Sequence, residues 1–147
     1  MKHKFFQYLL FLMISVSSYV YAASCLSIND HDQKVYCYAK QGQGSCTYIR
    51  DRDLKAQCNA ELGQGSCLSI NDHDQKAYCY AKQGQGSCTY IRDRDLKAQC
   101  NAELGQGSCL SINDHDQKAY CYAKQGQGSC TYIRDRDLKA RCNAEKK

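Results

Sequence analysis

Residues 25–45 read CLSINDHDQKVYCYAKQGQGS, and residues 46–66 read CTYIRDRDLKAQCNAELGQGS. These two 21-residue units share both cysteines, an isoleucine, an Asp-x-Asp pair, a lysine, an alanine and the closing Gly-Gln-Gly-Ser. Together they form a 42-residue block that recurs almost unchanged, so that the blocks are 25–66, 67–108 and a shorter last copy, 109–147. Self-similarity at such a period is typical of repeat architectures.

Each unit is expected to form one short helix between loops. Asp30 and Asp32 place negative charge where the first helical turn exposes unpaired N–H groups. Gly42 stands where a helix can end with a left-handed residue. We therefore predict helices near 30–41 and 51–62, and at the matching positions of later copies. Tandem helix-turn-helix pairs make an α-solenoid, so the sequence predicts an all-α, disulfide-stapled solenoid of six units in three blocks.

The first 22 residues have the pattern of a secretory signal. Two lysines precede an apolar run, and Ala22 offers a small residue at the cleavage point. The run is too short to cross a bilayer as a helix. We predict a signal peptide over 1–22 and a mature repeat domain over 23–147, secreted or periplasmic, with no membrane attachment after cleavage. Lipidation of Cys25 is a weaker alternative, because Cys25 is in step with every later cysteine.

All twelve cysteines lie in the predicted mature part. This density in an exported chain indicates a disulfide scaffold. Zinc sites usually contain cysteines two to four residues apart, and no such pair exists in this sequence. Helices this short cannot assemble a sufficient hydrophobic interior alone, so removal of the bridges is expected to unfold the array.

The sequence does not fix which cysteines pair. A fully helical path would separate Cys25 from Cys37 by ~18 Å, so a bond within one unit requires its leading loop to fold back along its own helix. A scheme that repeats the eight-residue gap leaves Cys25 and Cys142 at opposite ends. An antiparallel hairpin in each block is the favoured interpretation. The hairpin scheme pairs Cys25 with Cys58, Cys37 with Cys46, Cys67 with Cys100, Cys79 with Cys88, Cys109 with Cys142 and Cys121 with Cys130.

Asp30-His31-Asp32 is the most tempting candidate for metal binding or catalysis. Neighbouring residues on a helix point to different faces, however, so one triplet cannot surround an ion. Helix capping explains the two aspartates better. Every candidate group also occurs three times, whereas a catalytic site needs one unique constellation. The sequence therefore predicts no catalytic residues, no metal, no cofactor and no enzymatic activity.

The formal charge is +5, but the basic and acidic residues of each of the first two blocks balance. A nucleic-acid-binding protein would hold a basic face, so we predict no nucleic-acid partner. Copies this similar suit a role that scales with valency. The function predicted is a protein-binding scaffold. The alternatives are a structural protein that self-associates head to tail into extracellular filaments, and a secreted inhibitor or toxin-like effector.

Overall fold

The computed structural model describes residues 25–145, so the predicted signal peptide lies outside the described part of the chain. Within it, short 3-10 helices alternate with ten-residue α-helices, and no strand occurs. The α-helices are α2 (His31–Lys40), α3 (Arg52–Glu61), α4 (His73–Lys82), α5 (Arg94–Glu103), α6 (His115–Lys124) and α7 (Arg136–Glu145). The 3-10 helices are η1 (Cys46–Tyr48), η2 (Cys67–Ser69), η3 (Cys88–Tyr90), η4 (Cys109–Ser111) and η5 (Cys130–Tyr132).

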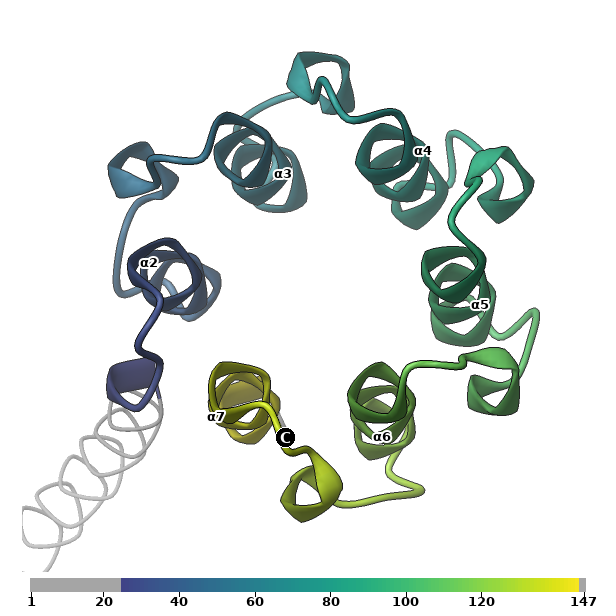
Figure 1. Ribbon diagram of the computed structural model, residues 1–147. Helices are drawn as coiled ribbons and strands as arrows, with labels where there is room; N and C mark the ends of the chain where they lie inside the picture. Colours follow the sequence, from purple (N-terminus) through teal and green to yellow (C-terminus); the bar gives the residue numbers. More distant parts are fainter. Residues whose placement is uncertain (1–24, 146–147) are drawn as a thin grey trace, which may run out of the picture.

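The six α-helices form a closed ring (Figure 1). They line the inside of the ring, the 3-10 helices lie outside them, and α7 returns to lie beside α2. The prediction of an all-α, disulfide-stapled repeat fold is confirmed, and the solenoid additionally closes on itself. We call units 25–45, 67–87 and 109–129 the Leu-type units, and units 46–66, 88–108 and 130–145 the Tyr-type units.

Each helix begins and ends where its local sequence directs. Asp30 is the N-cap of α2, and its side chain accepts a hydrogen bond from the Gln33 backbone N–H at 2.8 Å. The helix ends before Gly42, whose φ of +72° is a left-handed conformation that side-chain-bearing residues rarely adopt. The predicted helices over 30–41 and 51–62 are therefore confirmed to within one residue at each end.

Small apolar clusters join each unit to the next. One isoleucine per unit is at most 1% exposed, and each lies beside a disulfide and two buried side chains of the preceding helix, which are either two alanines or an alanine and a tyrosine. At the joint between α3 and α4, for example, Ile70 packs with Ala56 and Ala60. The alanines allow the helices to approach closely. The core is thus a series of six joints rather than one interior.

The helices of one block run parallel, which corrects the hairpin interpretation. At one end, Asp32 of α2 accepts the backbone N–H of Asp51, the N-cap of α3. At the other end, Lys40 of α2 pairs with Glu61 of α3. The same ends of both helices therefore lie together. Each unit is one complete turn of the solenoid, and the 3-10 helix carries the chain back to the starting face.

The predicted hairpin pairing of the cysteines is wrong. Each unit holds its own disulfide across a sequence separation of 12, and none of the described cysteines is free. The chain forms a 3-10 turn at the first cysteine and then folds back along its own helix, which brings Cα atoms to 5.7–5.8 Å. The bonds join Cys25 to Cys37, Cys46 to Cys58, Cys67 to Cys79, Cys88 to Cys100, Cys109 to Cys121 and Cys130 to Cys142.

The closing joint between α7 and α2 repeats the internal joints. Ile28 packs with Ala140 and Ala144, as Ile70 does with Ala56 and Ala60. The backbone N–H groups of the first unit also donate to an aspartate of α7, at the distances found inside the chain. Ring closure therefore needs no interface of a new kind.

Candidate functional site

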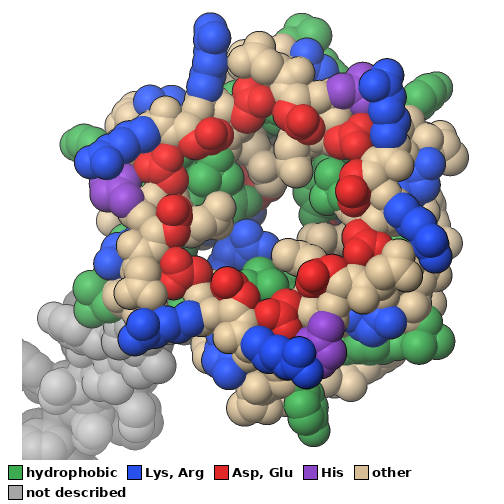
Figure 2. Space-filling model, viewed as in Figure 1, with side chains coloured by type: hydrophobic (Ala, Val, Ile, Leu, Met, Phe, Trp, Pro, Cys, Tyr) green, Lys and Arg blue, Asp and Glu red, His purple; other side chains and the backbone are tan. Residues whose placement is uncertain are grey.

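The ring encloses a cavity of about 1630 Å³, which is lined by side chains from all six helices. The opening at the centre of the ring is visible in Figure 2. The lining includes aspartates at the N-terminal ends of the helices, and glutamine, tyrosine, lysine and glutamate side chains nearer their C-terminal ends. Most of the residues that line the cavity are thus polar, and they recur with each block.

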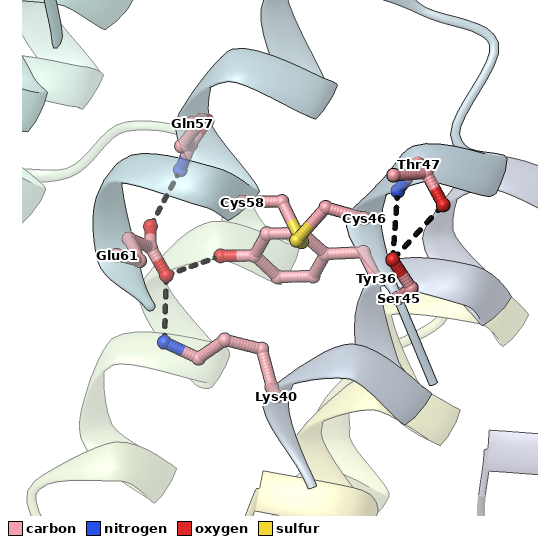
Figure 3. The surroundings of a disulfide bond; sticks show 8 residues. All are labelled: Tyr36, Lys40, Ser45, Cys46, Thr47, Gln57, Cys58 and Glu61. Atoms are coloured by element: carbon pink, nitrogen blue, oxygen red, sulfur yellow. Dashed lines mark hydrogen bonds and ion pairs between the residues drawn. A yellow bond between two sulfur atoms is a disulfide. The ribbon is translucent and has the colours of Figure 1, made fainter. Parts of the chain in front are cut away.

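Inside the cavity, each Leu-type helix is tied to the next Tyr-type helix by a partly buried hydrogen-bonded cluster, shown for the first block in Figure 3. Tyr36 Oη donates to Glu61 Oε2 at 2.6 Å, and Lys40 Nζ donates to the same oxygen at 2.6 Å. Gln57 Nε2 donates to Glu61 Oε1 at 2.9 Å. These three donors engage both oxygens of the Glu61 carboxylate.

The pKa values of this cluster follow from burial and hydrogen bonding. Burial alone would raise the pKa of Glu61, but the hydrogen bonds from the lysine, the tyrosine and the glutamine outweigh it, so its pKa is lowered. Burial, reinforced by the charge of Glu61, raises the pKa of Tyr36, which therefore remains a donor. A carboxylate held ionised between fixed donors is suited to binding helices together rather than to proton transfer.

The last unit differs at one position inside the cavity, where Arg141 replaces Gln57 and Gln99. Its guanidinium lies 4.9 Å from the centre of the Tyr120 ring, and its Nη1 donates to Gln33 Oε1 of the first unit at 3.3 Å. Arg141 therefore contacts both the preceding helix and the helix that closes the ring.

Charges of opposite sign are separated across the ring. In Figure 2 the acidic side chains surround the opening, and most of the Lys, Arg and His side chains lie outside them, while the basic groups that line the cavity lie within. All fifteen acidic residues accept hydrogen bonds: six cap their own helices, six receive backbone N–H groups of the next unit, and three pair inside the cavity. The negative charge is therefore committed to holding the ring together.

A set of cations has no such role, and we call it the outer basic set. Within residues 25–145, none of its members forms an ion pair. None of them lines the central cavity. The set comprises Lys34, Arg50, Arg52, Lys55, Lys76, Arg92, Arg94, Lys97, Lys118, Arg134, Arg136 and Lys139.

Six large apolar side chains are exposed on the described surface, one in each unit, and we call them the outer apolar residues. They follow the first cysteine of each unit and are 65–72% exposed. Figure 2 shows hydrophobic side chains projecting outward around the ring. They are Leu26, Tyr48, Leu68, Tyr90, Leu110 and Tyr132. The sequence signal for them was a leucine one residue, or a tyrosine two residues, after the first cysteine of each unit, outside the predicted helices, and it did not show that these side chains are exposed.

The two aspartates of the Asp30-His31-Asp32 triplet bind backbone N–H groups of two different units. The first aspartate caps its own helix, as predicted. The second accepts the backbone N–H groups of Arg50 and Asp51, at 3.0 and 2.7 Å, and His31 Nδ1 lies 2.9 Å from one of its oxygens. Among the described residues no group of three or more His, Cys, Asp or Glu side chains is placed to hold a metal ion.

Comparisons of the chain with protein-family models, with curated proteins and with solved structures found no significant match. None of the helices between residues 25 and 145 is long and apolar enough to span a bilayer. Six intrachain disulfides are typical of proteins in oxidising compartments.

Proposed function

We propose that this chain is an exported, non-catalytic scaffold, secreted or periplasmic, which presents repeated outer sites to a protein partner. The observation that carries the proposal is the set of six outer apolar residues, each about two-thirds exposed on a short, disulfide-anchored turn. Exposed apolar side chains are costly to leave in water and can mark interaction surfaces, and tyrosine is enriched among the residues that anchor protein interfaces. A rigid turn presents such an anchor at little entropic cost.

The repetition supports a multivalent function. Each site is held at a fixed place on a closed ring, so a partner with several matching sites would bind with increased avidity. Catalysis is disfavoured because the acidic groups, which would be the natural acids and bases, are all hydrogen-bonded to the ring itself.

The filament alternative has less support than the scaffold. A head-to-tail filament requires free faces on the first and last units. In the ring α2 and α7 contact each other, and the joint buries Ile28 against Ala140 and Ala144. Closure thus uses the surfaces that would otherwise join one molecule to the next.

Stepwise removal of the outer apolar residues tests the scaffold proposal. Serine would replace these residues in one, two or all three blocks, and each oxidised variant would be used to capture partners from surface extracts. The expected result is a partner whose retention falls steeply with each block and is lost in the variant without any of these residues. The matched control, Thr47→Ser with Thr89→Ser and Thr131→Ser, changes exposed residues of the same turns and should retain the partner. Equal capture by all variants would contradict the proposal.

A further inference from the structure

Acidic and basic residues balance within each of the first two blocks of the sequence, but the outer basic set gives the folded ring a cationic outer surface. The carboxylates are engaged within the ring, because they accept backbone N–H groups or bind the cavity lysines. None of the twelve cations of the outer basic set forms an ion pair in the described chain, although Arg52, Arg94 and Arg136 each act electrostatically on the aspartate that follows them. Their charges are therefore available to an external anion.

These cations are concentrated on the Tyr-type units. In the first of these units, Tyr48 is followed by the exposed Arg50 and Arg52, with Lys55 one helical turn further on. The corresponding stretch of a Leu-type unit has Asn29 and a histidine in place of the two arginines. The surface therefore carries three equivalent patches: Tyr48 with Arg50 and Arg52, Tyr90 with Arg92 and Arg94, and Tyr132 with Arg134 and Arg136.

We infer that these three patches bind an acidic polypeptide surface, one that combines carboxylates with apolar or aromatic side chains. The inference rests on the scaffold function proposed above and names the chemistry of the partner. Arginine offers paired N–H donors that match a carboxylate, and it is the cation favoured at protein interfaces. The neighbouring tyrosine supplies an amphipathic anchor that can pack against an apolar group.

Other polyanions match the surface less well. A double-stranded nucleic acid or an acidic polysaccharide would pair with the arginines. Its backbone offers no apolar pocket for the tyrosines. The patch arginines lie at the start of the Tyr-type helices, so they lie on the N-terminal face of the ring, where acidic side chains surround the opening (Figure 2). A flat anionic membrane that met this face would be repelled by those carboxylates, whereas a polypeptide can reach the patches separately. A polypeptide can supply both kinds of group at each of the three patches.

A binding experiment with defined polymers tests the inference. The probe is a labelled random copolymer of glutamate and tyrosine, and polyglutamate, a DNA duplex and vesicles containing phosphatidylglycerol serve as competing ligands. The oxidised full chain is expected to bind the copolymer more tightly than any of the others. The affinity should fall as salt increases.

Two variants with the same loss of charge provide the matched control. Arg52→Gln with Arg94→Gln and Arg136→Gln removes three charges from the patches and is expected to weaken copolymer binding by roughly tenfold. Lys34→Gln with Lys76→Gln and Lys118→Gln removes three charges from the Leu-type units and should weaken it by only about twofold. The arginine-to-lysine variant at the three patch positions should recover part of the lost affinity.

Equal losses in the two variants would overturn the inference, as would tighter binding of DNA or vesicles than of the copolymer. The scaffold proposal can fail separately. If the copolymer does not bind but capture of a partner still depends on the outer apolar residues, the scaffold stands and the acidic partner is refuted. If the copolymer binds at the arginines while the apolar residues have no influence on partner capture, the scaffold proposal fails instead.

Discussion

At the scale of the residue, the Asp-x-Asp pair of each unit joins neighbouring units of the ring. The first aspartate caps its own helix, and the second receives two backbone N–H groups from the next unit. The same arrangement recurs at all six joints, with Asp137 serving Asn29 and Asp30 at the closing one. One carboxylate per unit therefore both sets the register between neighbours and satisfies N–H groups that would otherwise lack a partner.

Acid should weaken these joints. The hydrogen bond from His31, followed by the N–H groups of Arg50 and Asp51, lowers the pKa of Asp32 to about 2, from an ordinary value of 3.8. A carboxyl whose pKa is lower in the folded state stabilises the fold above its unfolded pKa, and that stability is lost as pH falls through the folded value. We therefore expect the melting temperature to decrease as pH falls from about 4 to about 2.

Melting curves recorded across this pH range provide the measurement. The three joints that contain a histidine carry Asp32, Asp74 and Asp116, each with a pKa of about 2. Replacing these three residues with asparagine should lower the melting temperature at neutral pH and flatten its pH dependence. A melting temperature that stays constant from pH 5 to pH 2 in the unaltered protein would refute this role.

Only the capping role of the first aspartate could be predicted from the sequence. Capping by Asp30 could be predicted because its N–H partner lies three residues away, at Gln33. The partners of Asp32 lie 18 and 19 residues along the chain, and no local pattern connects them. The cavity cluster of Tyr36, Lys40 and Glu61 was missed for the same reason, since its members come from different helices.

At the scale of the element, the 21-residue unit is a ten-residue α-helix, a left-handed glycine turn and a short 3-10 turn stapled to the helix. The α-helices could be predicted because their caps and glycine ends are local. The 3-10 turn was missed, and with it the pairing of the cysteines. Once that turn reverses the chain, Cys67 meets Cys79 of its own unit, and a hairpin is unnecessary.

A single cysteine substitution distinguishes the two pairings. Cys67→Ser should free the thiol of Cys79, because these two residues form one bond. Loss of the bridge should also lower the free energy of unfolding by about 2–4 kcal/mol. Alkylation of the oxidised variant followed by peptide mass spectrometry identifies the free thiol, and denaturant titration measures the stability. Alkylation at Cys100 instead would restore the hairpin scheme.

At the scale of the whole molecule, six parallel helices place all their N-terminal ends on one face of the ring. The twelve aspartates of that face offset the positive ends of the helix dipoles. Closure itself could not be predicted, because the curvature of a solenoid comes from small rotations at each joint that the sequence pattern does not report. The separation of charge also depends on closure, which gives the ring an inside and an outside.

The closed ring is tested most directly by the distance between its first and last units in solution. Spin labels carried by unnatural amino acids at positions 27 and 139 would span the closing joint, and labels at 69 and 55 would span the equivalent internal joint. Pulsed electron paramagnetic resonance measures both distances while all six disulfides remain intact. The ring predicts the same distance for the two pairs, since both joints have the same packing and hydrogen bonds. A distance for the 27–139 pair far longer than that for the 69–55 pair would show an open solenoid and contradict the account.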